Sequence, residues 1–200
     1  YAAAQRLAAA VRLRTISLDG ERVAHAAEFR KLHALLKQSF PRAHAALKRE
    51  TVNELSLLYT WPGSDAAEKP IRLMAHQDVV PIAHGTERDW KADPFAGEIR
   101  DGFVWGRGAW DDKANLFAIF EAVETLAVAG FRPRRTIYIV AGHDEEVGGQ
   151  QGARAVAELL KSRGVQLEFV LDEGLLITEG VLKGLDKPLA VVGVAEKGYL

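Results

Sequence analysis

Residues 136–149, Thr-Ile-Tyr-Ile-Val-Ala-Gly-His-Asp-Glu-Glu-Val-Gly-Gly, decide the fold, because an apolar strand here runs directly into acidic side chains. Two other stretches repeat the pattern, Ile-Arg-Leu-Met-Ala-His-Gln-Asp at 71–78 and Leu-Glu-Phe-Val-Leu-Asp-Glu at 167–173. Segments of helical composition, 112–129 and 151–163, separate the strands. Such alternation predicts a three-layer α/β fold in which a mostly parallel sheet carries helices on both faces. Ligands of such sheets bind beyond the carboxyl ends of the strands.

The segments on either side of this region extend the same fold. Helices are expected over 2–14 and 21–39, the second ended by Pro41, and a strand is expected over 55–61. A further strand is expected over 189–195, five residues before the end of the sequence. We therefore expect the chain to be truncated before its fold is complete.

The composition excludes several classes of protein. The 200 residues hold 26 Lys and Arg, 27 Asp and Glu and no cysteine, which gives a formal net charge of −1. Balanced charge offers no electrostatic reason to expect a nucleic acid or an anionic membrane as partner. Without cysteine there are no disulfides, thiolate metal ligands or cysteine nucleophile. The apolar runs are shorter than the roughly 20 residues of a membrane span, so we expect no membrane segment in this chain.

His76 and Asp78 lie two residues apart at the end of the strand expected over 71–75. On an extended segment, alternate side chains point the same way, so both can face one crevice. A carboxylate behind an imidazole fixes its tautomer and raises its basicity, as in many zinc sites. A capping Asp and a surface His in a turn is the alternative explanation of this triplet.

A glycine-rich stretch, Gly-Arg-Gly-Ala-Trp-Asp-Asp-Lys at 106–113, leads into the helix expected over 112–129. It places Asp111 or Asp112 at the helix entrance, where Asp is also a preferred N-cap residue in any soluble protein. A phosphate-binding loop is excluded, because the stretch lacks the Gly-Lys-Ser/Thr ending and brings carboxylates where phosphate needs amides and lysine.

Acidic residues also end the next two strands, as Asp144-Glu145-Glu146 and Asp172-Glu173. Adjacent carboxylates at the end of a buried strand repel one another unless a cation neutralises them. Two adjacent glutamates can divide the work, one binding metal and one acting as a general base. A solvated acidic turn explains either cluster equally well by itself. With His76, the acids form a set of ligands that suits Zn²⁺, Mn²⁺ or Co²⁺.

At these residues the sequence resembles the co-catalytic zinc peptidases and amidohydrolases, a family that includes aminoacylase, succinyl-diaminopimelate desuccinylase and glutamate carboxypeptidase. Within it, the chain is most similar to the branch of Gly-X carboxypeptidase and carboxypeptidase S, which also contains N-acyl-amino-acid synthase/hydrolases. The similarity extends from about residue 50 to 200, with a looser match before it. The matching motifs, in family order and spacing, are 76–81, 90–95, 106–113, 142–149, 170–174 and 196–199.

The resemblance implies two zinc ions in a complete active site, with Co²⁺ or Mn²⁺ as substitutes. It assigns His76 and Asp172 to the first zinc, Glu146 to the second, and Asp111 to a bridge between them. One further His ligand comes from far downstream in the family, and this chain does not contain it.

The resemblance also implies the reaction and its catalytic residues. Asp78 orients His76, and Glu145 is the general base that passes a proton from water to the leaving amine. The expected activity is hydrolysis of an amide or peptide bond in a small peptide or an N-acyl amino acid, of the carboxypeptidase or aminoacylase type. A reversible N-acyl amino acid synthase/hydrolase and a metal-binding relic without catalysis are the alternatives. The intact Glu145 counts against the relic.

The domain organisation implied by the family is larger than this chain. Residues 1–200 correspond to the N-terminal segment of the catalytic domain. The lid domain, which supplies substrate-binding groups and the usual homodimer contact, and the remaining catalytic segment are absent. We therefore expect the chain by itself to be impaired or inactive.

Overall fold

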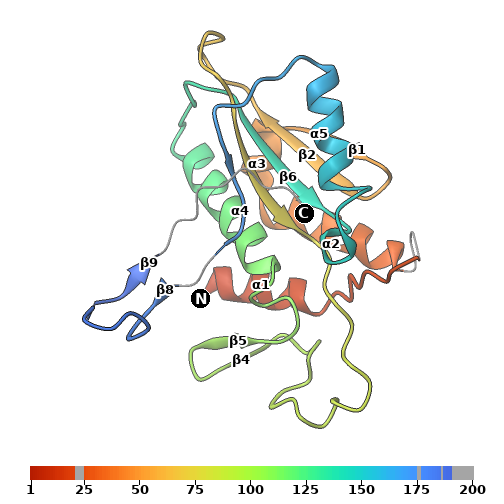
Figure 1. The fold of residues 1–200 in the computed structure, drawn as a ribbon. Helices are drawn as coiled ribbons and strands as arrows, with labels where there is room; N and C mark the ends of the chain where they lie inside the picture. The colour runs from red at the N-terminus through yellow and green to blue at the C-terminus, as the bar shows by residue number, and fades with distance from the viewer. Residues whose placement is uncertain (21–24, 175–176, 186, 191–200) are drawn as a thin grey trace.

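The computed structural model describes residues 1–20, 25–174, 177–185 and 187–190. Its centre is a five-stranded sheet with the strand order β1-β2-β6-β3-β7 (Figure 1). The strands of this sheet are β1 (Lys48–Val52), β2 (Ser56–Trp61), β3 (Ile71–His76), β6 (Ile137–Gly142) and β7 (Val170–Leu171). The helices are α1 (Ala2–Val11), α2 (Ala26–Ser39), α3 (Pro41–Ala46), α4 (Lys113–Val128), α5 (Ala153–Ser162) and the 3-10 turn η1 (Glu145–Val147). Two small hairpins complete the described elements, β4 (Glu98–Arg100) with β5 (Phe103–Trp105) and β8 (Ile177–Thr178) with β9 (Leu189–Ala190).

The sheet is mixed in its pairing but mostly parallel in direction. β3 pairs in parallel with both β6 and β7. β2 pairs antiparallel with β1 and with β6, so β2 alone among the described strands of this sheet runs against the others. The predicted α/β fold is confirmed, and the antiparallel β2 is the feature that the alternation of strands and helices did not predict.

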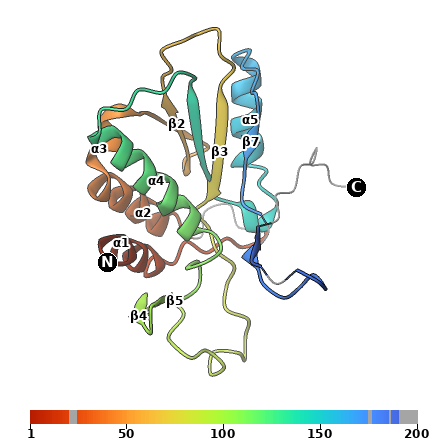
Figure 2. The same ribbon diagram turned by 90° about the vertical axis from the view of Figure 1, so that its left-hand side faces the viewer.

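Helices cover both faces of the sheet, which gives the three layers (Figure 2). On one face α1 to α4 bury a large apolar core against β2, β3 and β6, with Tyr59, Phe120 and Leu116 fully buried. On the other face α5 packs Val156 and Leu160 against Leu58 and Val140. Alternate residues of a strand point to opposite faces, so Leu58 and Tyr59 serve different cores.

Several expected boundaries shift once the chain packs. The first helix ends at Val11 rather than residue 14. Pro41 does end the helix before it, but it also opens α3 from the first helical position, where its missing N–H costs nothing. The strand expected over 167–171 shortens to β7. The expected strand over 189–195 is described only at β9, which pairs with β8, and residues 191–195 lie outside the described residues.

Candidate metal and catalytic site

The candidate site lies beyond the carboxyl ends of β3, β6 and β7, the edge at which the sequence predicts it. β3 and β6 are in register with His76 opposite Gly142, so the residues that follow both strands emerge side by side. The loop before α4 brings Asp111 and Asp112 to the same edge, and the chain after β7 brings Glu173. Three parallel strand ends and one loop thus gather residues from four distant parts of the sequence.

His76 is the centre of the cluster and is buried, with 3% of its side chain exposed. Its Nε2 lies 2.8 Å from Asp111 Oδ1. The same nitrogen is 3.7 Å from Glu173 Oε1 and 3.9 Å from Glu145 Oε2. On the other side of the ring, Nδ1 is 3.0 Å from the main-chain oxygen of Asp78. One ring nitrogen therefore faces the carboxylates and the other is held from behind.

Two groups of side chains have the spacing of a metal site. His76, Asp111 and Glu146 form one, and His76, Asp112 and Glu173 form the other, with ligand atoms within 4.8 Å of one another in each group. One imidazole nitrogen with carboxylate oxygens is a donor set that zinc accepts. The first group unites three of the four predicted ligands.

Asp172, the fourth predicted ligand, is placed differently from the other three. It is exposed, and its Oδ1 accepts a hydrogen bond of 3.0 Å from the main-chain N–H of Glu173. The carboxylate that approaches His76 at this strand end belongs to Glu173. The assignment of Asp172 as a ligand therefore stays a prediction, while the structure offers Glu173 at the same strand end.

Asp112 also has a role other than the one its helix position suggests. It is the N-cap residue of α4 and is buried, yet its side chain makes no capping hydrogen bond. Its Oδ2 instead accepts the main-chain N–H of His76 at 3.1 Å. The carboxylate thereby ties the end of β3 to the start of α4, which fixes the loop that carries Asp111.

Asp78 is fully buried and joins the histidine to the two glutamates. Its Oδ1 lies 3.3 Å from His76 Nδ1 and accepts the main-chain N–H of Glu145 at 3.2 Å. Its Oδ2 accepts the main-chain N–H of Glu146 at 3.1 Å and the hydroxyl of Ser17 at 2.6 Å. We call Asp78, the three donors to its carboxylate and the His76 ring beside it the Asp78 network. A single carboxylate thus sets the positions of the imidazole and of both glutamates.

The pKa values of the cluster reflect crowded negative charge. Burial lowers the pKa of His76, but the carboxylates of Asp78 and Asp112 outweigh it and raise the pKa to about 10. Burial and the charge of Asp111 raise the pKa of Glu146 to about 7. A potential that holds a proton this firmly on an imidazole also attracts a metal cation.

Asp78 is the exception among these carboxyl groups. Burial by itself would raise its pKa, but the hydrogen bonds from His76 and Ser17 hold the pKa below its ordinary value. Asp78 is therefore an anion behind His76 at neutral pH, which suits a group that orients a metal-binding imidazole.

Two contributors to the site, Ser17 and Glu173, were not assigned to it from the sequence, and a third, Lys113, was identified only as part of the motif 106–113. Ser17 reaches the Asp78 network from the segment after α1. Lys113 is fully buried and donates to the main-chain oxygens of Ala10 and Leu13 at 3.1 and 2.7 Å, so it anchors the end of α1 beside the loop of Asp111. Glu173 was noted only as part of an acidic pair. No local pattern marks Ser17, because its partner Asp78 lies 61 positions away in the sequence.

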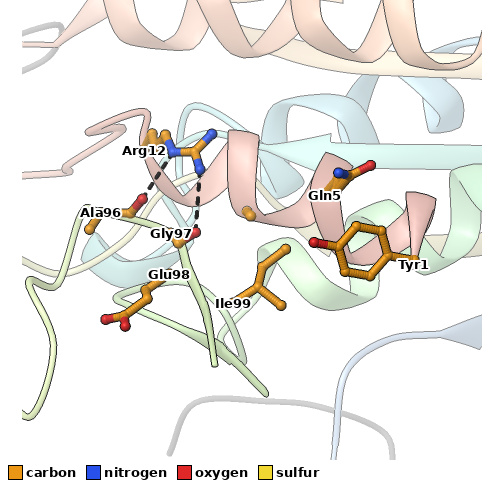
Figure 3. Close-up of a pocket in the computed structure, with 8 residues that line it drawn as sticks. Tyr1, Gln5, Arg12, Ala96, Gly97, Glu98 and Ile99 are labelled. Carbon is orange, nitrogen blue, oxygen red and sulfur yellow. Dashed lines mark hydrogen bonds between the residues drawn. The ribbon is translucent and has the colours of Figure 1, made fainter. Parts of the chain in front are cut away.

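A separate hollow of about 500 Å³ lies between α1 and β4, away from the cluster (Figure 3). Arg12 lines it at one end (Figure 3) and donates to the main-chain oxygens of Ala96 and Gly97 at 2.9 and 3.5 Å. Its lining includes none of the predicted site residues. Across the described residues, no helix is both long and apolar enough to cross a membrane.

Comparison with known proteins gives relatives along nearly the whole chain. Probable carboxypeptidase S-like 2 of Dictyostelium discoideum is 44% identical over 98% of this chain and 38% of its own length. Carboxypeptidase S of Saccharomyces cerevisiae is 46% identical over 86% of the chain and 30% of its own length. A human N-fatty-acyl-amino acid synthase/hydrolase is 39% identical over 98% of the chain and 38% of its own length. The chain thus spans less than two fifths of the length of these relatives.

Solved structures share the fold at low sequence identity. Human carnosine dipeptidase 1 matches with a TM-score of 0.64 and 22% identity, over 88% of this chain and 39% of its own. A metallo-carboxypeptidase of Sulfolobus solfataricus matches with a TM-score of 0.65 and 18% identity, over 86% and 37%. The sequence profile of peptidase family M20/M25/M40 matches residues 72–192. This range is more than half of the chain and includes all the strand ends of the site. The chain therefore belongs to peptidase family M20/M25/M40.

Proposed function

We propose that this chain carries the main part of the active site of a zinc-dependent hydrolase that cleaves an amide bond in a small peptide or an N-acyl amino acid. The observation that carries the proposal is the position of His76 Nε2, 2.8 Å from Asp111 and within reach of Glu145 and Glu146. Family membership supports the same conclusion.

The residues present fit the metal. His76, Asp111 and Glu146 offer one nitrogen and two carboxylates at the spacing of a metal site, and Asp172 or Glu173 would add a further oxygen. Zinc, when bound, supplies the positive charge that acidifies water and polarises the carbonyl of the substrate. Co²⁺ and Mn²⁺ accept the same ligand types, so either would substitute.

Glu145 is the proposed general base. Its side chain is 40% exposed and reaches to 3.9 Å from His76 Nε2, so its carboxylate faces the cluster and remains accessible to substrate. The carboxylate takes a proton from the attacking water as the oxygen adds to the carbonyl carbon. It then delivers that proton to the amine nitrogen as the C–N bond breaks. Asp78 keeps the main-chain N–H of Glu145 fixed through both transfers.

The names of the relatives suggest the substrate class and the rival reaction. The name carboxypeptidase S points to cleavage of a peptide bond, and the name of the synthase/hydrolase points to N-fatty-acyl amino acids. The second candidate function is therefore the reverse reaction, in which a fatty acid and an amino acid condense and release water. Both directions use the same bond, so product analysis from each side distinguishes them.

A complete enzyme would need more sequence than this chain. Since the relatives are more than twice as long, we propose that a further His ligand and a lid domain lie outside residues 1–200. The lid would also make a homodimer contact. Normal amide hydrolysis by these 200 residues alone would contradict this part of the proposal.

The test is release of free amino acid from a panel of dipeptides and N-acyl amino acids by the full-length enzyme. Activity should disappear on dialysis against a chelator and return with Zn²⁺, Co²⁺ or Mn²⁺. The matched control is Glu145→Gln, which keeps the shape of the side chain. Failure to cleave any member of the panel by a zinc-loaded preparation would contradict hydrolysis and leave synthesis to be measured in the same samples.

A further inference from the structure

The segment after α1 is strapped to the loop that carries the site. The main-chain N–H of Val79 donates to Thr15 O at 3.0 Å, and the N–H of Ser17 donates to Val79 O at 3.2 Å, which forms a parallel bridge centred on Ile16. The Thr15 hydroxyl adds a bond of 2.6 Å to Gln77 O. These bonds bring residues 15–17 alongside Gln77 and Val79, about sixty positions later in the chain, so we call this segment the strap.

The strap delivers one polar side chain to the catalytic network. Ser17 Oγ lies 2.6 Å from Asp78 Oδ2 and 3.1 Å from the main-chain oxygen of His143. A hydroxyl has one proton, and the shorter contact to a charged oxygen takes it. The Ser17 hydroxyl is therefore a charge-assisted donor to Asp78, and it enters from a different segment than the main-chain donors of Glu145 and Glu146.

The hydrogen bond from Ser17 to Asp78 affects several groups of the site at once, because the same carboxylate contacts all of them. Asp78 Oδ2 accepts both Ser17 and the N–H of Glu146, while Oδ1 faces His76 and the N–H of Glu145. If the carboxylate turns about its Cβ–Cγ bond, all of these contacts change together. A donor fixed by the strap stops that turn, because the backbone of Ser17 is itself hydrogen-bonded to Val79.

We propose that Ser17 is a positioning residue of the active site, whose hydroxyl locks Asp78 and through it the His76 ring and the Glu145-Glu146 main chain. Its effect on zinc rests on the proposed function, while its effect on the metal-free main chain does not. The alternative is that the strap matters only for folding. In that case the main-chain hydrogen bonds of the strap and the Thr15 hydroxyl, which Ser17→Ala leaves in place, would be enough to hold the strap, and the Ser17 hydroxyl would have no effect on the site.

The first test uses the metal-free chain. Amide hydrogen exchange at Glu145 and Glu146 should become about tenfold faster in Ser17→Ala, the order expected when a hydrogen bond to a charged group is lost. Ser17→Thr keeps the hydroxyl and should restore slow exchange. Ser162→Ala, which removes an exposed hydroxyl at the end of α5, is the matched control and should leave both amides unchanged. Unchanged exchange in Ser17→Ala would overturn the proposal.

The second test measures zinc affinity by competition with a chromophoric chelator. Ser17→Ala should weaken zinc binding by up to about tenfold, less than the 10- to 100-fold loss expected for the group directly behind a metal ligand, because Ser17 acts through Asp78. In an Asp78→Asn background the same change should have an effect of less than about twofold, because both substitutions act through one carboxylate. Equal effects in the two backgrounds would overturn the proposal. Absence of zinc from the wild-type chain would instead refute the proposed function, and the exchange experiment would still decide the role of Ser17.

Discussion

Replacing Asp78 with Asn changes one oxygen of a buried carboxylate to an amide NH₂ and removes the charge. In the wild type, each carboxylate oxygen accepts one main-chain N–H, from Glu145 on one side and Glu146 on the other. Asn presents a carbonyl oxygen to only one side. Whichever way it turns, its NH₂ faces a peptide N–H, and two donors cannot bond to each other. The Ser17 hydroxyl can rotate to accept, but a peptide N–H cannot.

The expected loss of unfolding free energy follows from this comparison of donors and acceptors. One half-buried N–H without a partner, and a charged acceptor replaced by a neutral one, together cost about 1.5–3 kcal/mol of unfolding free energy. The His76 ring also loses the anion behind Nδ1, so zinc affinity should fall about 10- to 100-fold. Urea unfolding in the presence of chelator measures the first quantity, and chelator competition measures the second.

Asp89→Asn is the matched control, because Asp89 is exposed and takes no part in the Asp78 network. Its unfolding free energy should stay within about 0.5 kcal/mol of the wild type. The reasoning on the Asp78 network is refuted if Asp78→Asn also stays within that range and binds zinc as tightly as the wild type.

Three further predictions concern the base, a turn and a buried histidine. Glu145→Gln should abolish turnover by the full-length enzyme and leave its zinc content unchanged, since an amide cannot take the proton; normal turnover would exclude Glu145 as the base. Gly63→Ala should cost about 1–3 kcal/mol in urea unfolding, because its Cβ would lie 2.5 Å from the main-chain nitrogen of Thr136; Gly174→Ala, which meets nothing within 4 Å, is the control. Burial lowers the pKa of His33 from 6.5, so below that pH the unfolded chain takes up a proton that the folded chain refuses. As the pH falls from 6.5 to 5, the unfolding free energy of the wild type should therefore decrease by up to about 1.4 kcal/mol per pH unit more than that of His33→Gln. Unfolding free energies that change in parallel with pH in the two proteins would contradict this.

The strands that could be predicted well from the sequence are those in which an apolar run ends abruptly at polar or charged residues. β3 was expected over 71–75 and is found over Ile71–His76, because an apolar run stops at charged or polar residues on the sheet edge. β6 was expected over 136–141 and is found over Ile137–Gly142 for the same reason. β1 was missed because Lys48–Val52 is polar and mostly exposed, and only its pairing with β2 makes it a strand.

In the candidate site, too, local features could be predicted from the sequence and long-range contacts could not. His76 and Asp78 could be placed together because i, i+2 spacing on an extended segment is a local property. The bonds of Asp78 to Glu145 and Glu146 span 67 and 68 positions, and that to Ser17 spans 61. Such contacts depend on strand order and register, which no local pattern contains. β7 ends at Leu171 as expected, so the choice between Asp172 and Glu173 depends on which of the two side chains turns toward His76 after the strand, and no local pattern contains that.

Zinc content is the most direct test of the metal site. The purified chain should be dialysed at neutral pH and its zinc measured by elemental analysis, alongside a His76→Ala variant shown to be folded. About one ion per chain is expected in the wild type, because one imidazole and several carboxylates suffice for one site. The variant should hold none. A folded wild-type chain without zinc, or a variant that retains as much as the wild type, would contradict a metal site centred on His76.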